Sequence, residues 1–528
     1  MSIILSDVSY HYPNEQPLFK GIHATIATNA KVSFTGSNGT GKSTLLKLVA
    51  GLISPDTGQI ICTSRPYYIP QHLGFLHCTV AEALGIAPKL AALQAIMQGS
   101  VNQQDYDTLA DDWDIEARYT AALQYWQLPD LPPDTPMDSL SNGEKTKVFL
   151  AGILLHRPAI ILLDEPTNHI DAGSRALLYD FVVQHKATMI VVSHDIALLD
   201  LLDTTCELSP KGLQRYGGNY SFYAAQKALE DQALEQSILN EEKQMRLAKK
   251  KAREVAQRQE KRIQQGEKQK TEVPRIYKNT LRDSAEKTAA KLKDQHSSIL
   301  SNSTEKLSAL RAQKNTIEHL KINFDNAALH SGKLLLQASR VQYAYMPGHP
   351  LWNAPVDFTL YSSDRIHLTG RNGSGKSTLV RLLTGALQPQ SGTIQRNPFS
   401  WIYLEQNYEV VNVDCSIAEL AQQYNHTHLE DHEVKIRLNR FLFPAETWHK
   451  KCRDLSGGEK MRLYLCCLMI SNHTPDLIIL DEPTNNLDIQ GIKILTQTIK
   501  QYQGSLLVIS HDKHLVAGIG VQTSFELG

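Results

Sequence analysis

The sequence predicts an α/β protein made of two similar α/β domains joined by a long helical linker. A glycine-rich loop between a strand-like and a helix-like segment occurs twice, and apolar strands alternate with helical segments in each half. Between the halves lies a long, polar, lysine- and glutamate-rich stretch. Buried strands that alternate with helices are typical of a largely parallel sheet covered on both faces. We therefore divide the chain into residues 1–220, 221–330 and 331–528.

The bulk composition is that of a globular protein of more than one domain. The 528 residues are too many for a single core, and 42% hydrophobic and 21% charged residues are ordinary values. A net charge of −1 gives no overall attraction to nucleic acid or membranes. Because no apolar run is long enough to span a bilayer and no signal-peptide pattern is present, we expect a cytoplasmic protein without a membrane domain. Seven scattered cysteines fit a reducing compartment, and Cys466 and Cys467 are expected to be buried thiols.

The first glycine-rich loop, residues 36–44, has the pattern of a phosphate-binding loop between a strand and a helix. Glycines let backbone N–H groups turn toward a triphosphate, Lys42 reaches the β- and γ-phosphates, and the Ser43 hydroxyl binds Mg²⁺. Residues 370–378 repeat the pattern, which argues against chance. The predicted ATP-binding residues of the two loops are Gly36, Asn38, Gly39, Gly41, Lys42, Ser43, Thr44, Gly370, Asn372, Gly373, Gly375, Lys376, Ser377 and Thr378.

Tyr12 and Tyr345 occupy equivalent places upstream of the two loops. An aromatic ring there can stack on an adenine, or it can pack into the core as an ordinary strand residue. The sequence leaves both interpretations open.

Four further motifs follow each loop in the same order. A short apolar strand ends in glutamine, a small-residue turn opens a helix and forms a second anion site, a buried strand ends in two acids, and a last strand ends in histidine. These residues are Gln71, Ser141, Asn142, Gly143, Asp164, Glu165 and His194 in the first half, and Gln406, Ser456, Gly457, Gly458, Asp481, Glu482 and His511 in the second. The first half also has a helix-rich insertion near residues 88–116.

This ordered set of motifs resembles the ATP-binding cassette superfamily over nearly the whole chain. Walker A, Q-loop, signature, Walker B and switch-histidine motifs all occur twice. Residues 164–171 and 481–488, and the run 216–221 before a charged helix, resemble the ABC-F family of tandem cassettes that act on ribosomes. One departure is Asn142, where the signature usually has its first glycine. This departure raises the question whether the two sites hydrolyse ATP at equal rates.

The resemblance implies two Mg²⁺-dependent ATP hydrolysis sites, each completed by the signature of the other cassette in a monomer. Asp164 and Asp481 would support the metal together with the loop serines and the Q-loop glutamines. Glu165 and Glu482 would polarise the attacking water, and His194 and His511 would orient the γ-phosphate. Site one joins the first loop to Ser456, Gly457 and Gly458, and site two joins the second loop to Ser141, Asn142 and Gly143.

The linker has heptad-spaced apolar residues in two segments separated by Gly266 and Pro274, which predicts an antiparallel coiled coil with its turn in 266–279. Residues 241–294 hold 17 Lys and Arg against 9 Asp and Glu, so this region carries +8 and the rest −9. A solvated spacer is one interpretation, and a polyanion-binding arm is the other. With the resemblance, we expect ribosomal RNA as the partner and tRNA as a further candidate. The predicted tip, or alternatively a hydrophobic plug, is Val273, Pro274, Arg275, Ile276 and Tyr277.

The leading functional hypothesis is a ribosome-associated ATPase that acts on translation through its linker, either as a translation factor or as a protector against ribosome-targeting antibiotics. The alternative is an ATPase subunit that energises a separate membrane transporter, which the fused cassettes and the basic linker disfavour. A DNA-repair or chromosome-type ATPase would have far longer coils or zinc modules than this sequence provides.

Overall fold

A computed structural model describes residues 2–13, 17–71, 77–128, 131–209, 212–268, 298, 301–311, 332–371, 373–405, 408–411, 413–426, 428–471, 475–484 and 487–527. The chain separates into one unit that contains both cassettes, residues 1–221 and 319–528, and a second unit, residues 222–318. The boundaries at 220 and 330 stay predictions.

The first cassette is built on a mostly parallel sheet. Its described strands lie in the order β5 (Tyr67–Ile69), β6 (Ile160–Asp164), β7 (Thr188–Val192), β3 (Lys31–Thr35), β8 (Thr204–Ser209) and β9 (Gly212–Tyr216). The first five are parallel, and β9 pairs antiparallel with β8. Every residue of β6 and β7 is buried, which is why these strands are continuously apolar. The predicted largely parallel sheet is confirmed.

A second, antiparallel sheet of the first cassette was not predicted. It has the order β2 (Pro17–Ile26), β1 (Ile3–His11) and β4 (Thr57–Cys62). Ile3 and Leu5 of β1 share one core with Leu45 and Leu46 of α1 (Lys42–Val49), so this sheet packs over the helix that follows the glycine-rich loop. This packing brings the end of β1, and with it Tyr12, to the loop.

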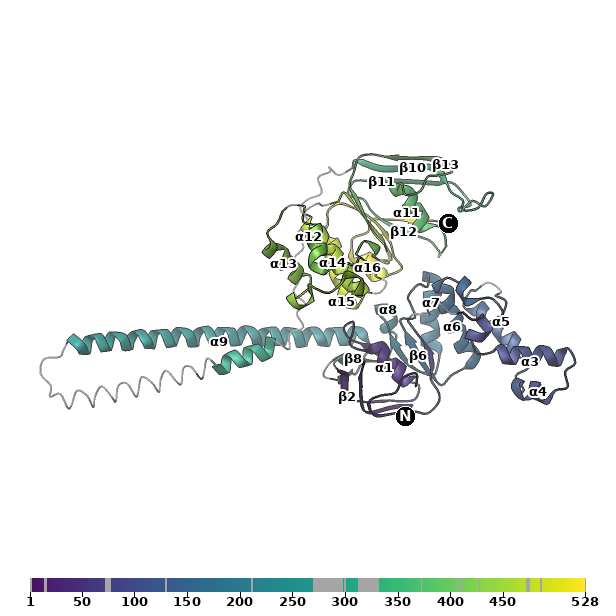
Figure 1. Ribbon diagram of the computed structural model, residues 1–528, viewed down its shortest axis with the longest axis horizontal. Coiled ribbons are helices and arrows are strands. Elements are labelled where there is room, and N and C mark those ends of the chain that lie inside the picture. The colour runs from purple at the N-terminus through teal and green to yellow at the C-terminus, as the bar shows by residue number, and fades with distance from the viewer. Residues whose placement is uncertain are drawn as a thin grey trace. The chain divides into compact units, whose positions relative to one another are not determined.

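Along the chain, the helices of the first cassette alternate with or follow these strands, and most of them are labelled in Figure 1. Residues 88–116 form α3 and α4 and the start of α5, as the helix-rich composition of this insertion predicts. The helices are α2 (Val80–Ala83), α3 (Ala87–Met97), α4 (Gln103–Leu109), α5 (Ile115–Tyr125), the 3-10 helix η1 (Met137–Ser139), α6 (Asn142–His156), α7 (Ala172–Gln184) and α8 (Ile196–Leu199).

The second cassette repeats this plan. Its parallel strands lie in the order β14 (Trp401–Leu404), β15 (Leu477–Asp481), β16 (Ser505–Ile509), β12 (Arg365–Thr369) and β17 (Thr523–Glu526). Its antiparallel sheet has the order β11 (Val356–Tyr361), β10 (Leu334–Gln342) and β13 (Ser391–Arg396). The helices are α11 (Lys376–Thr384), η2 (Glu409–Val411), α12 (Ile417–Gln423), α13 (Asp431–Arg440), η3 (Ala445–Thr447), η4 (Cys452–Asp454), α14 (Gly457–Ile470), α15 (Ile489–Gln501) and α16 (Lys513–Gly518). Cys466 and Cys467 of α14 are fully buried, as predicted.

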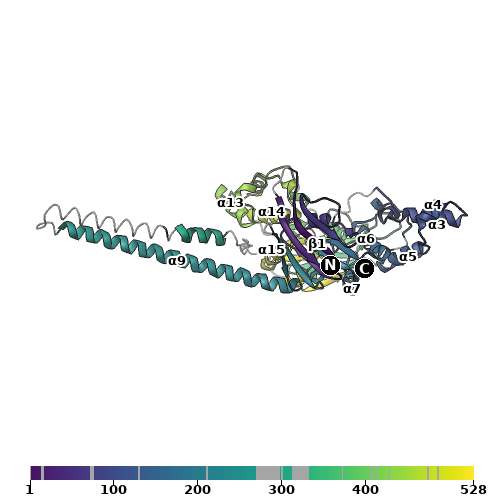
Figure 2. The same cartoon turned by 90° about the horizontal axis from the view of Figure 1, so that it is seen from below.

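Most of α9 (Tyr220–Lys268), a helix of 49 residues whose length both views show (Figures 1 and 2), lies in the second unit. Residues 301–311 are also helical, and Arg311 Nη2 lies 2.7 Å from Glu242 Oε1 of α9. Ile238 and Leu307 are buried within this unit. The helix continues through Gly266, while the predicted tip, 273–277, lies outside the described residues, and the coiled coil stays a prediction. In the described part of the chain, no helix combines the length and the apolar character needed to cross a membrane.

Candidate functional site

The first glycine-rich loop requires glycine at two positions. Gly36 and Gly41 have φ values of 147° and 92°, in the left-handed region that side chains rarely adopt. A Cβ atom on Gly36 would lie 2.4 Å from the carbonyl oxygen of Leu208, and one on Gly41 would lie 2.5 Å from Leu18 Cδ2. Gly41 is also the N-cap residue of α1, so the N–H groups of the loop lie next to those of the helix N-terminus.

Each loop lysine folds back over its own loop. Lys42 Nζ donates to the carbonyl oxygens of Gly36 and Ser37, over 2.8 and 3.0 Å. In the second loop, Lys376 Nζ makes the same contacts with Gly370 and Arg371, over 2.7 and 2.9 Å. Burial lowers the pKa of Lys42, and the nearby Glu165 opposes this shift. Both ammonium groups are thus positioned at the centre of a cradle that suits an anionic phosphate.

The first acid of each buried pair contacts the loop serine. Ser43 Oγ donates to Asp164 Oδ1 over 3.0 Å, and Ser377 Oγ donates to Asp481 Oδ2 over 2.9 Å. The serines stand in the first turn of α1 and α11, and the aspartates end β6 and β15. The sequence placed these residues far apart in the chain, and the fold brings each pair into contact.

Two tyrosines on the same aspartates were missed in the sequence. Tyr68 OH donates to Asp164 Oδ2 over 3.1 Å, and Tyr403 OH donates to Asp481 Oδ2 over 2.8 Å. Burial raises the pKa of both phenols, so they remain donors. Each stands three residues before the glutamine that ends its strand segment. The repeated position was the signal that could have found them.

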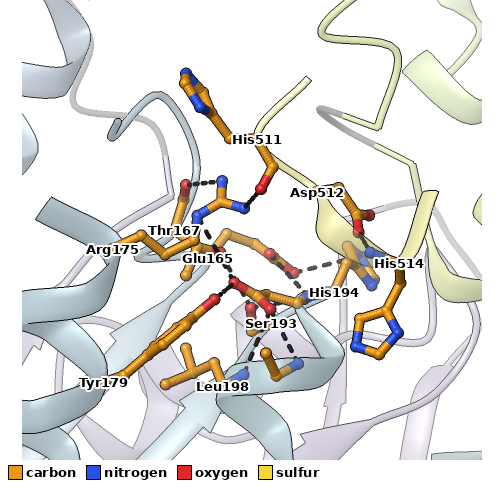
Figure 3. Close-up of polar contacts among 12 residues, drawn as sticks. Glu165, Thr167, Arg175, Tyr179, Ser193, His194, Leu198, His511, Asp512 and His514 are labelled. Atoms are coloured by element: carbon orange, nitrogen blue, oxygen red, sulfur yellow. Dashed lines mark hydrogen bonds and ion pairs between the residues drawn. The ribbon is translucent and has the colours of Figure 1, made fainter. Parts of the chain in front are cut away.

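The second acid of each pair faces its switch histidine. Glu165 Oε2 accepts from the main-chain N–H of His194 over 3.1 Å, and Glu165 Oε1 lies 3.3 Å from His194 Nε2 (Figure 3). In the second cassette, Glu482 Oε1 lies 3.5 Å from His511 Nε2. Glu165 and Glu482 have φ values of 52° and 46°, so both carboxylates are held on locally strained backbone.

Burial sets the protonation of these groups. It raises the pKa of Glu165 to about 8 and that of Glu482 to about 7. The neighbouring aspartate adds to the rise in each case. Burial lowers the pKa of both His194 and His511 to about 4, which leaves the imidazoles neutral. At a pH above these values the two carboxyls are ionised, and an ionised carboxylate of raised pKa beside a neutral imidazole is a suitable proton acceptor.

Tyr12 and Tyr345 do not lie in the core. Their exposed fractions are 38% and 62%, and their hydroxyls lie 2.8 and 2.9 Å from the Oγ1 atoms of Thr44 and Thr378. Tyr12 meets Tyr10 edge to face with ring centroids 5.3 Å apart. The interpretation as core aromatics is therefore wrong for these two residues, and stacking on adenine stays a prediction.

Two cavities contain the predicted residues of sites one and two. The first, of about 600 Å³, is lined by Lys42, Gln71, Asp164, Glu165 and His194 of the first cassette and by Ser456 and Gly457 of the second. The second, of about 730 Å³, is lined by Lys376, Ser377, Asp481, Glu482 and His511 of the second cassette and by Ser141, Asn142 and Gly143 of the first. Gly458 lies near Asn38, because a Cβ atom on it would be 3.9 Å from Asn38 Nδ2. Asn372 and Gln406 lie outside the described residues.

The two signature helices begin with the same capping box. The hydroxyls of Ser141 and Ser456 accept a hydrogen bond from the main-chain N–H three residues later. The carboxylates of Glu144 and Glu459 in turn accept from the main-chain N–H of the two serines. Asn142 occupies the first helical position of α6 and lacks a positive φ, so its side chain is accommodated without backbone strain. Arg175, which also lines the second cavity, was missed in the sequence.

The comparisons with known proteins agree with this geometry. The sequence pattern of the family described as ABC transporter matches residues 19–168 and 354–485, which together exceed half of the chain. The chain belongs to this family. Members bind ATP through such cassettes and hydrolyse it, and this chain is an ATPase.

The relatives extend over nearly the whole chain. ABC transporter F family member 2 of Arabidopsis thaliana is 28% identical, over 98% of this chain and 75% of its own. The tylosin resistance ATP-binding protein TlrC of Streptomyces fradiae is 28% identical, over 95% of this chain and 93% of its own. Within the ABC transporter family, the chain is a member of the ABC-F family. The fold resembles that of an archaeal ribosome recycling factor, aABCE1, with a TM-score of 0.58, 16% identity, and coverage of 98% of this chain and 86% of that chain.

Proposed function

We propose that this ABC-F protein is a ribosome-associated ATPase that binds two ATP molecules between its cassettes and acts on translation through its basic linker. The observation that carries the proposal is the pair of cavities, each lined by the loop lysine, the two acids and the switch histidine of one cassette and by the signature helix start of the other. A cytoplasmic location follows from this role.

The phosphates bind at the two lysines in this proposal. Lys42 and Lys376 exchange their carbonyl partners for the β- and γ-phosphates, which are stronger acceptors because they are charged. The loop N–H groups and the helix N-terminus add further donors. Tyr12 and Tyr345, exposed beside the loops, provide the adenine contact.

The residues present fit a magnesium ion bound with ATP. The ion needs few protein oxygens when phosphates and water supply the rest, and each site offers a serine hydroxyl and an aspartate in contact. Ser43, Gln71 and Asp164 would hold it in site one, and Ser377, Gln406 and Asp481 in site two. When bound, the ion would neutralise charge on the phosphates.

The water is activated by Glu165 and Glu482 in this proposal. At a pH above its raised pKa each carboxyl is ionised and is a stronger proton acceptor than an ordinary carboxylate. The neutral imidazoles of His194 and His511 lie 3.3 and 3.5 Å from the two carboxylates. The imidazole N–H then orients the γ-phosphate. Ser141, Asn142, Gly143, Ser456, Gly457 and Gly458 close the opposite side of each phosphate with helix N–H groups.

The ribosome is the partner we propose for the linker. A charge of +8 over residues 241–294 of a near-neutral protein suits the phosphates of ribosomal RNA, with tRNA as a further candidate. The names of the relatives support this direction, since one confers tylosin resistance and a protein of similar fold recycles ribosomes. An antiparallel coiled coil with residues 273–277 at its tip would carry movement of the cassettes to the ribosome.

Sedimentation tests the proposal. The Glu165→Gln, Glu482→Gln variant retains its phosphate cradles but lacks the proton acceptors, so with ATP it should accumulate in the ribosome fraction of a sucrose gradient. The matched control is the Lys42→Ala, Lys376→Ala variant, which should stay in the unbound fraction. Recovery of the first variant in the membrane fraction, with none on ribosomes, would instead favour a transporter subunit. Drug-susceptibility measurements in a deletion strain then separate antibiotic protection from a general translation role.

A further inference from the structure

Site two receives a cation from the opposite cassette. Arg175 lies in the first turn of α7, and its Nη1 donates to the main-chain carbonyl oxygen of His511 over 3.0 Å (Figure 3). Its Nη2 donates to the carbonyl oxygen of Thr167 over 3.1 Å. We call the switch histidine and the residue after it the switch segment of each cassette. The guanidinium of Arg175 thus connects the switch segment of the second cassette to Thr167, two residues after Glu165 in the first cassette. The side chain is only 15% exposed, so these contacts are largely shielded from water.

The guanidinium also forms an ion pair with Asp195, which belongs to the switch segment of site one. Arg175 Nε lies 3.8 Å from Asp195 Oδ2, and Tyr179 OH donates to the same oxygen over 2.5 Å. The other oxygen, Oδ1, accepts from the N–H groups of Ala197 and Leu198 at the start of α8. Because Asp195 directly follows His194, Arg175 contacts the switch segments of both sites.

At the position equivalent to Arg175, site one has an apolar residue in place of a cation. Asp171 and Asp488 cap α7 and α15 in the same way, accepting from Ser174 N–H over 2.8 Å and from Gly491 N–H over 2.7 Å. This shared register places Ile492 at the position of Arg175. Ile492 is 7% exposed and packs in the core of the second cassette, and its side chain has no hydrogen-bond donor. The cross-cassette contact is therefore present for His511, and among the described side chains of α15 (Ile489–Gln501) none makes an equivalent contact with His194.

We propose that Arg175 is a positioning residue of site two, which fixes the His511 segment against the first cassette and makes the two ATPase sites unequal. The inference rests on the proposed roles of Glu482 and His511. The planar guanidinium of Arg175 donates to two carbonyl oxygens at once, and this fixes the main chain of His511. The His511 side chain in turn faces Glu482. The positive charge also lies at a cavity that would contain the γ-phosphate, where it favours the closed, ATP-bound arrangement.

The experiment measures each site separately. The Glu165→Gln background leaves site two intact, and the Glu482→Gln background leaves site one intact. Arg175→Leu and Arg175→Lys are placed in both, with Ile492→Leu as the matched control at the equivalent position. The readout is the first-turnover rate of phosphate release from bound ATP, because a glutamine variant can hold the cassettes closed after one turnover. Melting temperatures monitor folding.

We expect Arg175→Leu to slow site two by roughly tenfold to a hundredfold, the effect of losing hydrogen bonds from a charged donor. Site one should change by less than about threefold, because Asp195 keeps its hydrogen bonds from Tyr179 OH and from the N–H groups of Ala197 and Leu198. Arg175→Lys retains the positive charge but not the planar guanidinium with its several donors, so its rate at site two should lie between those of Arg175→Leu and the unchanged protein. Ile492→Leu should change neither site by more than about threefold, since swaps of equal volume are tolerated.

Two outcomes would overturn the inference. One is an unchanged rate at site two in Arg175→Leu. The other is an equal loss at both sites with a lowered melting temperature, which would show that Arg175 only supports folding. Failure of the proposed function gives a different result: the Glu165→Gln, Glu482→Gln protein would still hydrolyse ATP, whatever residue stands at 175.

Discussion

Replacing Tyr68 with phenylalanine removes one hydroxyl and leaves the ring in place. This hydroxyl donates to Asp164 Oδ2 over 3.1 Å, while Ser43 Oγ donates to Oδ1 over 3.0 Å. Asp164 is 1% exposed, so water cannot readily replace the lost donor. A hydrogen bond to a charged group contributes roughly 1.5–3 kcal/mol. Because Ser43 still contacts the carboxylate, we expect the lower end, about 1.5 kcal/mol, or about a tenfold slower turnover at site one.

The neighbouring Tyr67 provides a matched control. It lies on the same strand, β5, and its hydroxyl donates to the carbonyl oxygen of Phe149 over 3.0 Å, away from the aspartate. Tyr67→Phe therefore loses a hydrogen bond of similar length without touching the metal site. Both variants are made in the Glu482→Gln background, and the first-turnover rate of phosphate release is measured with its dependence on Mg²⁺ concentration.

We expect Tyr68→Phe to lower the rate and to require more Mg²⁺ for half-maximal activity, because an aspartate with one donor fewer is less well oriented toward the ion. Tyr67→Phe should show a lower melting temperature with a near-normal rate. The reasoning fails if the two variants behave alike in rate and Mg²⁺ dependence, since the hydroxyl of Tyr68 would then serve only the packing of β5.

Four further tests address the rest of the proposal. Lys42→Ala with Lys376→Ala should nearly abolish ATP binding in equilibrium titration, and undiminished affinity would refute the cradle assignment. Glu165→Gln with Glu482→Gln should bind ATP at near-normal affinity with turnover reduced at least about a hundredfold, and a normal steady-state rate would remove the water-activating role. Replacing residues 267–278 by a short Gly/Ser turn should leave basal ATPase activity near normal and abolish the effect on translation in a cell-free assay, whereas full translation activity would reduce the linker to a spacer. Asn142→Gly in the Glu165→Gln background should change the first-turnover rate by less than about threefold, because a substitution at an unstrained first helical position costs at most about 1 kcal/mol in helix stability; a tenfold change would show that this side chain acts on ATP.

The sequence predicted the parts of the site that local chemistry determines. Gly36 and Gly41 need a backbone conformation that only glycine adopts readily, and Asp164 ends a strand that is apolar because it is buried on both faces. Such constraints appear in the residue types themselves. The antiparallel sheet β2-β1-β4 was not predicted, because alternation alone does not specify a partner strand and because β4 pairs with β1 across the loop and α1.

The residues that sequence reasoning missed act through contacts between distant segments. Tyr68 resembles any strand aromatic until β5 is paired with β6, which places its hydroxyl on Asp164. Comparison of the two halves could have found it, since Tyr403 repeats the position. No such comparison finds Arg175, because the second half has Ile492 there and the partner of Arg175 is a main-chain oxygen 336 positions away in the chain.

The motifs indicate Asn142 as the origin of unequal hydrolysis at the two ATP sites, whereas the structure indicates Arg175. Asn142 departs from the usual signature, yet α6 and α14 start with the same capping box and neither Asn142 nor Gly457 has a positive φ. The N–H groups that would face the γ-phosphate are consequently available at both sites. The asymmetry that the structure does contain is the guanidinium of Arg175, which holds the His511 segment and has an isoleucine as its counterpart. A motif departure that leaves the backbone unchanged is thus a weaker cause of unequal hydrolysis than an ordinary-looking helix residue that contacts the other cassette.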